Sequence, residues 1–513
     1  MADDAVMISR VGLPDEQVFV GLDNMPKDTK LNYLSTILAK TQGSLTNTSY
    51  YEVISMNTVQ IPRVVIAGTN SGVGKTTIVA GLLAAYANGG RTVQSFKVGP
   101  DYIDPGFHKI ASGRDSYNLD TWLVPPHKLT PFFATMAHDV DLAIIEGVMG
   151  LYDGGREGVS STAQIAKQLN APVVLVIDCK AMGESAAAIA KGFRDYDPEV
   201  NFGGVILNRL GSANHERMVR EGMDKIGVPV IGAIYRDDRM HSPERHLGLT
   251  PVTEIDPTEA INTIREAVEK MVNLDALLEI ATGAPTIELP DAIDVKSIEK
   301  RVKIGVAYDE AFSFYYPASL AALEEKGAEL VYFSPLNDSV IPDVDGLVFG
   351  GGFPEMFLFQ LSSNESMKES IRQANAQGMP IYAECGGLMY LCESIHDFEG
   401  SVYKTVGIVP ANCVMQQKLQ KVGYVTATAK RDTLLGAMNT AIRGHEFHFS
   451  TMEPTIDDFP WAFHLEGGRK PQSYDGGYAT KNVLASYLHL NFAGSDEGAQ
   501  HFVDTCAAYK AQK

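Results

Sequence analysis

The sequence lacks any uninterrupted apolar stretch of about 18 residues, which is the length that a membrane-spanning helix requires. It also lacks a basic start followed by an apolar block, so we see no secretory signal. The five cysteines form no close pairs in the sequence, and this spacing argues against a disulfide framework or a zinc ribbon. These absences favour a cytoplasmic protein in a reducing compartment, with no membrane partner.

Basic residues are scarce relative to acidic ones. The 43 lysines and arginines stand against 63 aspartates and glutamates, which gives a formal net charge of −20. An acidic surface disfavours non-specific binding to nucleic acid, and a polyanionic substrate would need a locally basic pocket. We therefore expect no nucleic-acid partner. The length of 513 residues is enough for two or three domains with buried cores.

The most informative feature that is present is the glycine-rich run GTNSGVGKTT at positions 68–77. It follows an apolar run at 64–67 and precedes a helical pattern at 78–87. A glycine turn between a strand and a helix is typical of a phosphate-binding loop, because backbone N–H groups at a helix N-terminus can hold a triphosphate. The spacing departs from the strict Walker pattern, because Thr69 stands where the first glycine is expected.

We predict a separate role for each part of this run. Glycines at 72 and 74 let the backbone close on phosphate, Lys75 reaches the outer phosphates, and the Thr76 hydroxyl lies on Mg²⁺. The predicted ATP ligands in the run are Gly72, Gly74, Lys75, Thr76 and Thr77.

Strand-like apolar runs alternate with helical patterns from Ile61 onward. Repeated β-α units with buried strands predict a parallel, doubly wound sheet of the α/β class. A second β-α series follows a segment that contains glycine, prolines and several charges. The predicted organisation is an N-terminal extension at 1–58, an ATP-binding domain at 59–280, a linker at 281–301 and a second α/β domain at 302–513. The extension could be a disordered appendage, a small docking element or the result of a misassigned upstream start, and it contains a possible short helix at 31–40.

A second constellation lies in the run IYAECGGLMYL at 381–391. An apolar strand ends at Cys385 and a glycine pair opens a helix, which is typical of a nucleophile elbow. A helix N-terminus stabilises a thiolate. His489 ends another apolar strand and could accept the thiol proton. A buried structural cysteine and an ordinary strand-end histidine remain the alternatives.

The glycine turn GGGFPE at 350–355 follows the apolar run 347–349. Exposed backbone N–H groups on such a turn, at Gly351 and Gly352, could stabilise an oxyanion. The alternative is a simple tight loop.

From Ile61 to the C-terminus the chain resembles the cobyrinate a,c-diamide synthases, which are glutamine-dependent amidotransferases of tetrapyrrole cofactor biosynthesis. The motifs that carry the resemblance are IPRVVIAGTNSGVGKTT, FKVGPDYIDPGFH, YNLDTWL, EGVMGLYDG, ILNR, ERHLGL, GGGFPE, AECGGLMYL, RGHEFHFS and SYLHLNF. The resemblance implies a P-loop domain of the dethiobiotin-synthetase type, followed by a domain of the class I glutamine amidotransferase type.

For the second domain, the resemblance implies that Cys385 is the nucleophile and His489 is its base. Ordinary class I glutaminases carry a carboxylate two residues after the histidine, where this chain has Asn491. The group that orients His489 is therefore unassigned, and Glu446 and His448 are candidates by their positions in the sequence.

For the first domain, Glu146 ends an apolar strand and is placed like an acidic Mg²⁺ ligand of such folds. Asn208 resembles the adenine-binding position of related synthetases, although an asparagine in a turn is the competing explanation. Two acids in KVGPDYIDPGFH could hold Mg²⁺, orient the substrate or simply brace a rigid turn. The predicted metal ligands are Thr76, Glu146 and Asp101. The predicted substrate contacts are Asp101, Tyr102, Asp104, His108, Asn118 and Asp120.

The implied activity is that of a carbon–nitrogen ligase that takes its nitrogen from glutamine. The expected reaction amidates the a and c carboxylates of cobyrinate in cobalamin biosynthesis, through an acyl phosphate and ammonia from the glutaminase site. Three alternatives stay open: Ni-sirohydrochlorin of the coenzyme F430 route as the substrate, cobyric acid synthase, and a non-catalytic P-loop scaffold. The implied cofactors are ATP and Mg²⁺, and the implied partners are L-glutamine, a tetrapyrrole and a second copy in a homodimer.

Overall fold

The computed structural model describes residues 5–9, 17–20, 36–39, 57–155, 158–237, 244–245, 248–249, 256–289, 299–468 and 472–513. The chain divides into one unit at residues 1–55 and another at residues 56–513. Part of the predicted linker, residues 290–298, lies outside the described residues.

The first unit contains a three-stranded antiparallel sheet in the order β2-β1-β3. Its strands are β1 (Ala5–Ser9), β2 (Gln17–Val20) and β3 (Thr36–Ala39). The predicted short helix at 31–40 is therefore wrong over residues 36–39, and its other residues lie outside the described ones. The β-branched Thr36 and Ile37 fit a strand better than a helix, and β3 pairs with β1.

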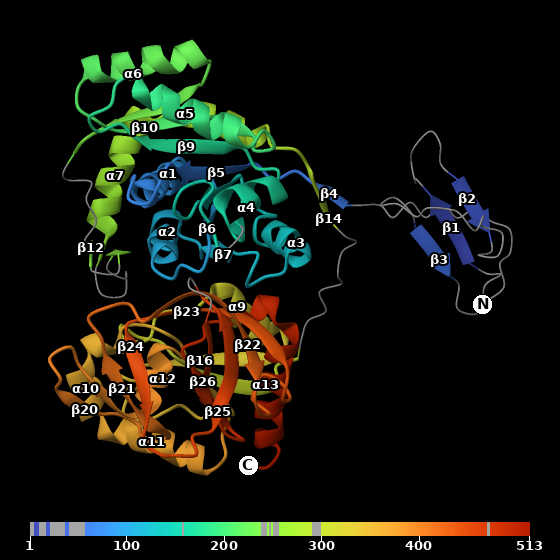
Figure 1. Ribbon diagram of the computed structural model, residues 1–513, viewed down its shortest axis with the longest axis vertical. Helices are drawn as coiled ribbons and strands as arrows, with labels where there is room; N and C mark the ends of the chain where they lie inside the picture. Colours follow the sequence, from blue (N-terminus) through green and yellow to red (C-terminus); the bar gives the residue numbers. More distant parts are fainter. Residues whose placement is uncertain are drawn as a thin grey trace. The chain divides into compact units, whose positions relative to one another are not determined.

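The second unit begins with a seven-stranded parallel sheet in the order β11-β10-β9-β5-β8-β6-β7 (Figure 1). Its strands are β5 (Arg63–Gly68), β6 (Val93–Val98), β7 (Tyr117–Leu119), β8 (Leu142–Glu146), β9 (Val173–Asp178), β10 (Phe202–Leu210) and β11 (Val230–Tyr235). The helices around it are α1 (Lys75–Asn88), α2 (Asp104–Ser112), α3 (Pro126–Met136), α4 (Thr162–Gln168), α5 (Ser185–Tyr196), α6 (Ala213–Ile226), α7 (Thr258–Met271) and α8 (Leu274–Thr282).

Two short strand pairs accompany this sheet. Strand β4 (Asn57–Val59) pairs with β14 (Ile287–Leu289), and β12 (Glu244–Arg245) pairs with β13 (Gly248–Leu249), both antiparallel.

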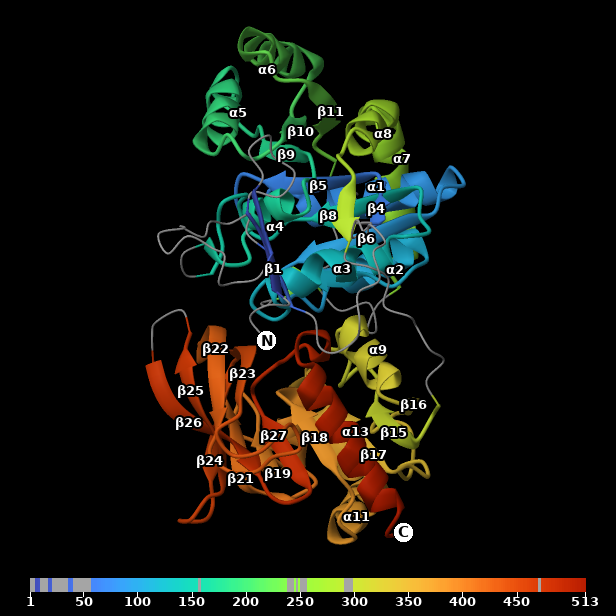
Figure 2. The same cartoon turned by 90° about the vertical axis from the view of Figure 1, so that its right-hand side faces the viewer.

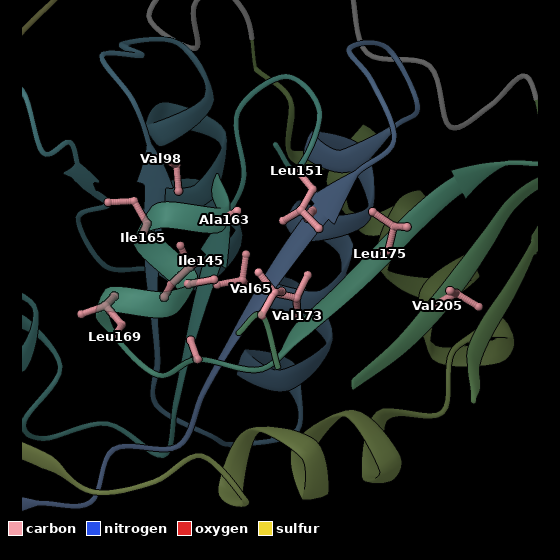
Figure 3. Close-up of a cluster of buried hydrophobic side chains, with 14 of the residues drawn as sticks. Val65, Val98, Ile145, Leu151, Ala163, Ile165, Leu169, Val173, Leu175 and Val205 are labelled. Atoms are coloured by element: carbon pink, nitrogen blue, oxygen red, sulfur yellow. The ribbon is translucent and has the colours of Figure 1, made fainter. Parts of the chain in front are cut away.

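Helices bury both faces of this sheet. Successive side chains of a strand point to opposite faces, so neighbouring residues belong to different cores. In β5, Val65 belongs to the core beneath α3, α4, α5 and α6, whereas Val64 belongs to the core beneath α1, α7 and α8. Figure 3 shows the first of these cores, where Val65 and Val173 lie next to Ile145. The predicted α/β class with a parallel, doubly wound sheet is confirmed.

A nine-stranded mixed sheet follows in the order β16-β15-β17-β18-β27-β26-β25-β22-β23 (Figure 2). The first five strands in that order are parallel: β16 (Ala328–Phe333), β15 (Val302–Ala307), β17 (Gly346–Phe349), β18 (Ile381–Glu384) and β27 (Val483–Ser486). The antiparallel part is β26 (Gln472–Ala479), β25 (Trp461–Gly467), β22 (Lys421–Ala429) and β23 (Ala441–His448).

A four-stranded sheet packs beside it, with β20 (Val402–Lys404), β19 (Cys392–His396), β21 (Val409–Met415) and β24 (Ser450–Pro454) in that order. The α-helices of this region are α9 (Pro317–Glu325), α10 (Leu358–Ser363), α11 (Glu365–Ala376), α12 (Gly386–Leu391) and α13 (Asp496–Lys510), and two short 3₁₀ helices lie at Pro354–Met356 and Phe492–Gly494. The β-rich extension over 392–479 is a feature that the sequence patterns did not indicate.

None of the helices in the part of the chain that the structure describes is both long enough and apolar enough to cross a membrane.

Arg63 ties the start of the central strand β5 to distant parts of the chain. Its side chain is fully buried and donates hydrogen bonds to the carbonyls of Leu169 (2.6 Å), Ile61 (3.0 Å), Asn170 (3.3 Å) and Pro285 (2.7 Å). Burial lowers the pKa of Arg63 to about 10, so the guanidinium stays charged at neutral pH. One side chain thus joins the end of α4 and the approach to β14.

Replacing Arg63 should destabilise this region strongly. Arg63→Met keeps an apolar stem but leaves four carbonyls without their donor, so we expect a loss of about 3 kcal/mol or more in the free energy of unfolding. Urea unfolding measures it. The control is Arg217→Met on α6, an exposed arginine paired with Glu221, for which we expect a change within about 0.5 kcal/mol. Equal effects in the two variants would contradict the role of Arg63.

Candidate functional site

Cys385 lies on a sharp turn between β18 and α12. Its φ is 44°, a left-handed conformation that a non-glycine residue rarely adopts. The turn is held by backbone bonds from Cys385 N to Ser486 O (2.7 Å) and from Gly387 N to Gly350 O (3.0 Å). A Cβ at Gly387 would lie 2.5 Å from the Phe349 carbonyl oxygen, so the turn requires glycine there. The strand–turn–helix geometry presents the Cys385 thiol at the carboxyl edge of the sheet.

A cavity of about 230 Å³ opens beside this thiol. Cys385 and His489 both line it, together with Gly352, His448 and Tyr102. The volume is below the ~300–1,000 Å³ that is usual for drug-sized ligands. The cavity therefore suits a small substrate held next to a nucleophile.

His489 follows β27 and is 2% exposed. Its backbone pairs with His445 through hydrogen bonds of 2.9 and 2.8 Å, and its Nδ1 lies 3.3 Å from Glu384 Oε2. Burial lowers the pKa of His489, but the negative charges of Cys385 and Glu384 outweigh burial and raise this pKa to about 10. The His489 imidazole therefore carries its extra proton at neutral pH.

The glycine turn after β17 lies against the same histidine. A Cβ at Gly351 would lie 2.7 Å from His489 Cε1, and a Cβ at Gly386 would lie 3.1 Å from Gly352 N. The structure thus brings the two predicted oxyanion glycines next to Cys385 and His489.

The two residues proposed from the sequence as orienters of His489 have other partners. His448 Nδ1–H donates to Ser450 O (2.8 Å), and the ring stacks on Tyr487. Burial lowers the pKa of His448 to about 4, so the ring is neutral. Glu446 accepts a hydrogen bond from the Tyr474 hydroxyl.

The carboxylate that reaches His489 is that of Glu384, which the sequence analysis did not consider. The signal that could have found it is its place directly before the nucleophile, at the end of a strand that neighbours β27.

The glycine-rich turn before α1 has a conformation that needs its glycines. Gly72 and Gly74 have φ values of 79° and 92°, and a Cβ at Gly74 would lie 2.5 Å from Asn208 Nδ2. Asn208 also donates to Val73 O at 2.8 Å. Lys75 Nζ donates to Met149 O at 2.7 Å, and burial lowers the pKa of Lys75 to about 8. Thr77 lies in the first turn of α1, half-buried.

A buried cluster of oxygen atoms adjoins this turn. The Thr76 hydroxyl donates to Glu146 Oε1 (2.7 Å) and lies 3.2 Å from Asp104 Oδ2. Lys97 Nζ bridges the same two carboxylates at 2.9 and 2.6 Å. His108 Nε2 lies 2.6 Å from Glu146 Oε2. A hydroxyl and two carboxylates are the hard oxygen ligands that Mg²⁺ prefers.

The pKa values of the two carboxyl groups shift in opposite directions. Burial and the nearby Asp101 raise the pKa of Asp104 to about 6. Burial also acts on Glu146, but Lys97 and His108 outweigh it and hold the pKa of Glu146 well below its usual range. The described residues contain no group of three or more His, Cys, Asp or Glu side chains placed to hold a metal ion.

The remaining predicted metal and substrate residues shape the segment that follows β6. Asp101 Oδ1 accepts from the backbone N–H of Asp104 (3.0 Å), at the start of α2. Asn118 donates to Gly99 O (2.8 Å) and Asp101 O (2.7 Å). Asp120 is 1% exposed and accepts from the Tyr424 hydroxyl at 2.6 Å. These contacts brace the segment, and direct contact of these residues with a substrate stays a prediction.

Tyr102, which belongs to the segment after β6, lines the cavity beside Cys385. Its ring stacks on Phe314 (5.2 Å between centroids) and on Tyr316 (4.4 Å), and lies 5.3 Å from the His489 ring. Two residues later, Asp104 meets Thr76. The six residues from Gly99 to Asp104 therefore contact both the thiol cavity and the oxygen cluster.

Comparison with known families identifies a domain for each half of the second unit. Residues 64–249 match the CobQ/CobB/MinD/ParA nucleotide binding domain, and residues 303–497 match the CobB/CobQ-like glutamine amidotransferase domain. The first half is therefore a nucleotide-binding domain that contains the glycine-rich turn, and the second contains Cys385 and His489.

Similar curated proteins cover most of the chain. The cobyrinate a,c-diamide synthase of Dehalococcoides mccartyi (strain CBDB1) is 44% identical over 456 residues, which is 87% of this chain and 98% of that protein. The enzyme of the same name from Leptospira interrogans (serovar copenhageni) is 41% identical and covers 87% of this chain and 99% of its own length. The one from Methanobrevibacter smithii is 42% identical, with 84% and 96% covered.

The charges around His489 predict its titration. Because the negative charges of Cys385 and Glu384 raise the pKa of His489 to about 10, we expect the imidazole to stay protonated at pH 8. NMR of histidine-labelled protein measures it, with His489→Gln to assign the signal. In Cys385→Ala the titration midpoint should fall, since one of the two charges is gone. A wild-type midpoint near 6.5 would contradict the charge arrangement.

Proposed function

Because the chain belongs to the cobyrinate a,c-diamide synthase family, we propose that it amidates the a and c carboxylates of cobyrinate with ATP and glutamine, in cobalamin biosynthesis. The family membership confirms the resemblance that the motifs indicated, and with it the assignment to glutamine-dependent carbon–nitrogen ligases. The residue roles below are part of the proposal.

Nitrogen is released at the thiol cavity. The Cys385 sulfur attacks the side-chain amide carbon of glutamine, and backbone N–H groups of Gly351 and Gly352 stabilise the oxyanion. The carbon–nitrogen bond breaks as the His489 imidazolium gives its proton to the leaving nitrogen, which departs as ammonia. His489 then takes a proton from water, and the resulting hydroxide attacks the thioester. The carbon–sulfur bond breaks and glutamate leaves.

The carboxylate is activated at the other site. Backbone N–H groups of residues 72–77 and Lys75 hold the triphosphate. Asn208 is the proposed contact for the adenine. Oxygens of Thr76, Glu146 and Asp104 would hold Mg²⁺, with Asp104 in place of the Asp101 predicted from the sequence, and the ion would neutralise phosphate charge. The ring carboxylate takes the γ-phosphoryl group of ATP. Ammonia then attacks this acyl phosphate, phosphate leaves, and the amide forms with loss of a proton.

The observation that carries this proposal is the segment from Gly99 to Asp104. Within this segment the ring of Tyr102 lies against the ring of His489, and two residues later Asp104 contacts Thr76 of the glycine-rich turn. A short path between the sites favours transfer of ammonia without escape to solvent, where protonation would remove its nucleophilic lone pair. The contacts of this one segment support coupling of glutamine hydrolysis to amide synthesis.

Ni-sirohydrochlorin is the second candidate substrate. The proposed chemistry acts on carboxylates at the edge of a tetrapyrrole and places no demand on the metal in the ring. The same residues would therefore serve coenzyme F430 biosynthesis.

Mass spectrometry of the products tests the substrate. We expect wild-type protein with ATP, Mg²⁺ and glutamine to convert cobyrinate into a diamide, since each amidation replaces a hydroxyl by an amino group and changes the mass. Ni-sirohydrochlorin is offered in parallel. Conversion of the nickel compound alone would move the assignment to the second candidate, and amidation of other side chains of the ring would contradict the a,c regiochemistry.

Replacing the nucleophile should separate the two nitrogen sources. Cys385→Ala removes the sulfur that attacks glutamine, so glutamine-supported amidation should fall by a factor of at least ~10³. Amidation supported by ammonium salts should remain, because it bypasses the thiol. Lys75→Ala is the matched variant in the other site and should abolish amidation from both sources. If Cys385→Ala also lost the ammonia-supported reaction, the two-site account would fail.

A further inference from the structure

We propose that Glu384 is the acidic positioning residue of the Cys385–His489 pair, in place of the carboxylate that position 491 lacks. This inference rests on the proposed glutaminase chemistry and assigns a further residue to it. It places the acid directly before the nucleophile, on the strand end that also carries the elbow.

The geometry places Glu384 against the imidazole. Glu384 Oε2 lies 3.3 Å from His489 Nδ1, and both side chains are buried, at 8% and 2% exposure. An ionised carboxylate only accepts hydrogen bonds, so Nδ1–H is the donor. The other ring nitrogen, Nε2, is then the one available to exchange a proton with the thiol. A carboxylate in this place fixes the tautomer and stabilises the imidazolium.

Glu384 is itself held in place through its other oxygen. The Tyr382 hydroxyl donates to Oε1 at 2.5 Å, and the backbone N–H of Leu490 donates to the same atom at 3.4 Å. Burial and the charge of Glu384 raise the pKa of Tyr382 well above its usual value, so the hydroxyl stays protonated and remains a donor. With Oε1 occupied by these donors, Oε2 is left for His489.

The topology explains how this residue reaches the histidine. Strands β18 and β27 are parallel neighbours, and Glu384 pairs with Ser486 in register. Parallel strands end at the same edge of the sheet, so the last side chain of β18 lies beside the chain that leaves β27 toward His489.

The residue at the usual position has a different task. Asn491 Oδ1 accepts from the backbone N–H of Ala493 (3.0 Å) and from the Ser319 hydroxyl (3.3 Å). The side chain of Asn491 therefore caps the short 3₁₀ helix at 492–494. Position 491, where ordinary class I glutaminases carry the acid, therefore has a structural role in this chain. We assign the negative charge beside His489 to Glu384.

Kinetics of Glu384 variants test the proposal. Glu384→Gln removes the charge at nearly constant shape, so we expect the kcat of glutamine hydrolysis to fall roughly 10²–10⁴-fold with little change in KM. Glu384→Asp keeps the negative charge, so its kcat should lie between those of Glu384→Gln and the wild type. The matched variant is Glu446→Gln, the same change at the other buried carboxylate near the cavity, which should leave the pH profile of hydrolysis in place.

The titration midpoint of His489 is a second measurement, and loss of a residue that only supports the fold would not change it. The titratable groups around His489 include Cys385, Glu384, His445, Tyr102, His448 and Glu446. Glu384→Gln should lower the midpoint of the His489 titration, because it removes one of the two charges that raise it. Tyr382→Phe keeps the carboxylate but removes its hydroxyl donor, so it should lower the kcat of hydrolysis by less than Glu384→Gln does.

The ammonia-supported reaction distinguishes a failure of the Glu384 assignment from a failure of the proposed amidation function. Ammonia-supported amidation by Glu384→Gln should persist, as in Cys385→Ala. A wild-type kcat together with an unchanged His489 titration in Glu384→Gln would overturn the assignment. Loss of ammonia-supported amidation as well would also overturn it, because Glu384 would then act on the fold and not on the glutaminase pair.

Discussion

The buried ammonium of Lys97 is the interaction on which the arrangement of the two sites depends. At 4% exposure it bridges Asp104 and Glu146, two carboxylates that would otherwise repel each other out of water. Through Glu146 it holds the end of β8 next to Thr76, and through Asp104 it fixes the start of α2. The segment before α2 then has a fixed course. Tyr102, two residues ahead of Asp104, is carried into the cavity that contains the thiol.

The two sites use the same structural principle with different chemistry. Each lies where parallel strands end and a glycine turn opens a helix, so backbone donors and side chains converge at one edge of a sheet. In the first domain the turn before Lys75 leaves N–H groups for an anion. In the second the turn at Cys385 presents a thiol, and Glu384 and His489 meet because β18 and β27 are neighbours. The short segment from Gly99 to Asp104 connects the two.

Local patterns were sufficient for the elements that begin at each turn. The apolar runs and glycines around 68–77 and 381–391 predicted strand, turn and helix, and the alternation of such units predicted the α/β class. The pattern failed at 36–39, where pairing with β1 gives a strand, because cross-strand partners decide such short segments. It also missed the strands over 392–479, whose register is set by distant partners in the sheets.

The sequence by itself determined the motifs, because a phosphate-binding turn and a nucleophile elbow are made by residues adjacent along the chain. Only the tertiary structure decided which side chains complete them. Glu384 reaches His489 across 105 positions, Lys97 reaches Glu146 across 49, and Tyr102 meets a ring nearly four hundred residues away. Such contacts depend on strand order and on the course of a loop, and no spacing along the sequence encodes either. The identity of the acid beside the histidine therefore emerges only when β18 and β27 are paired.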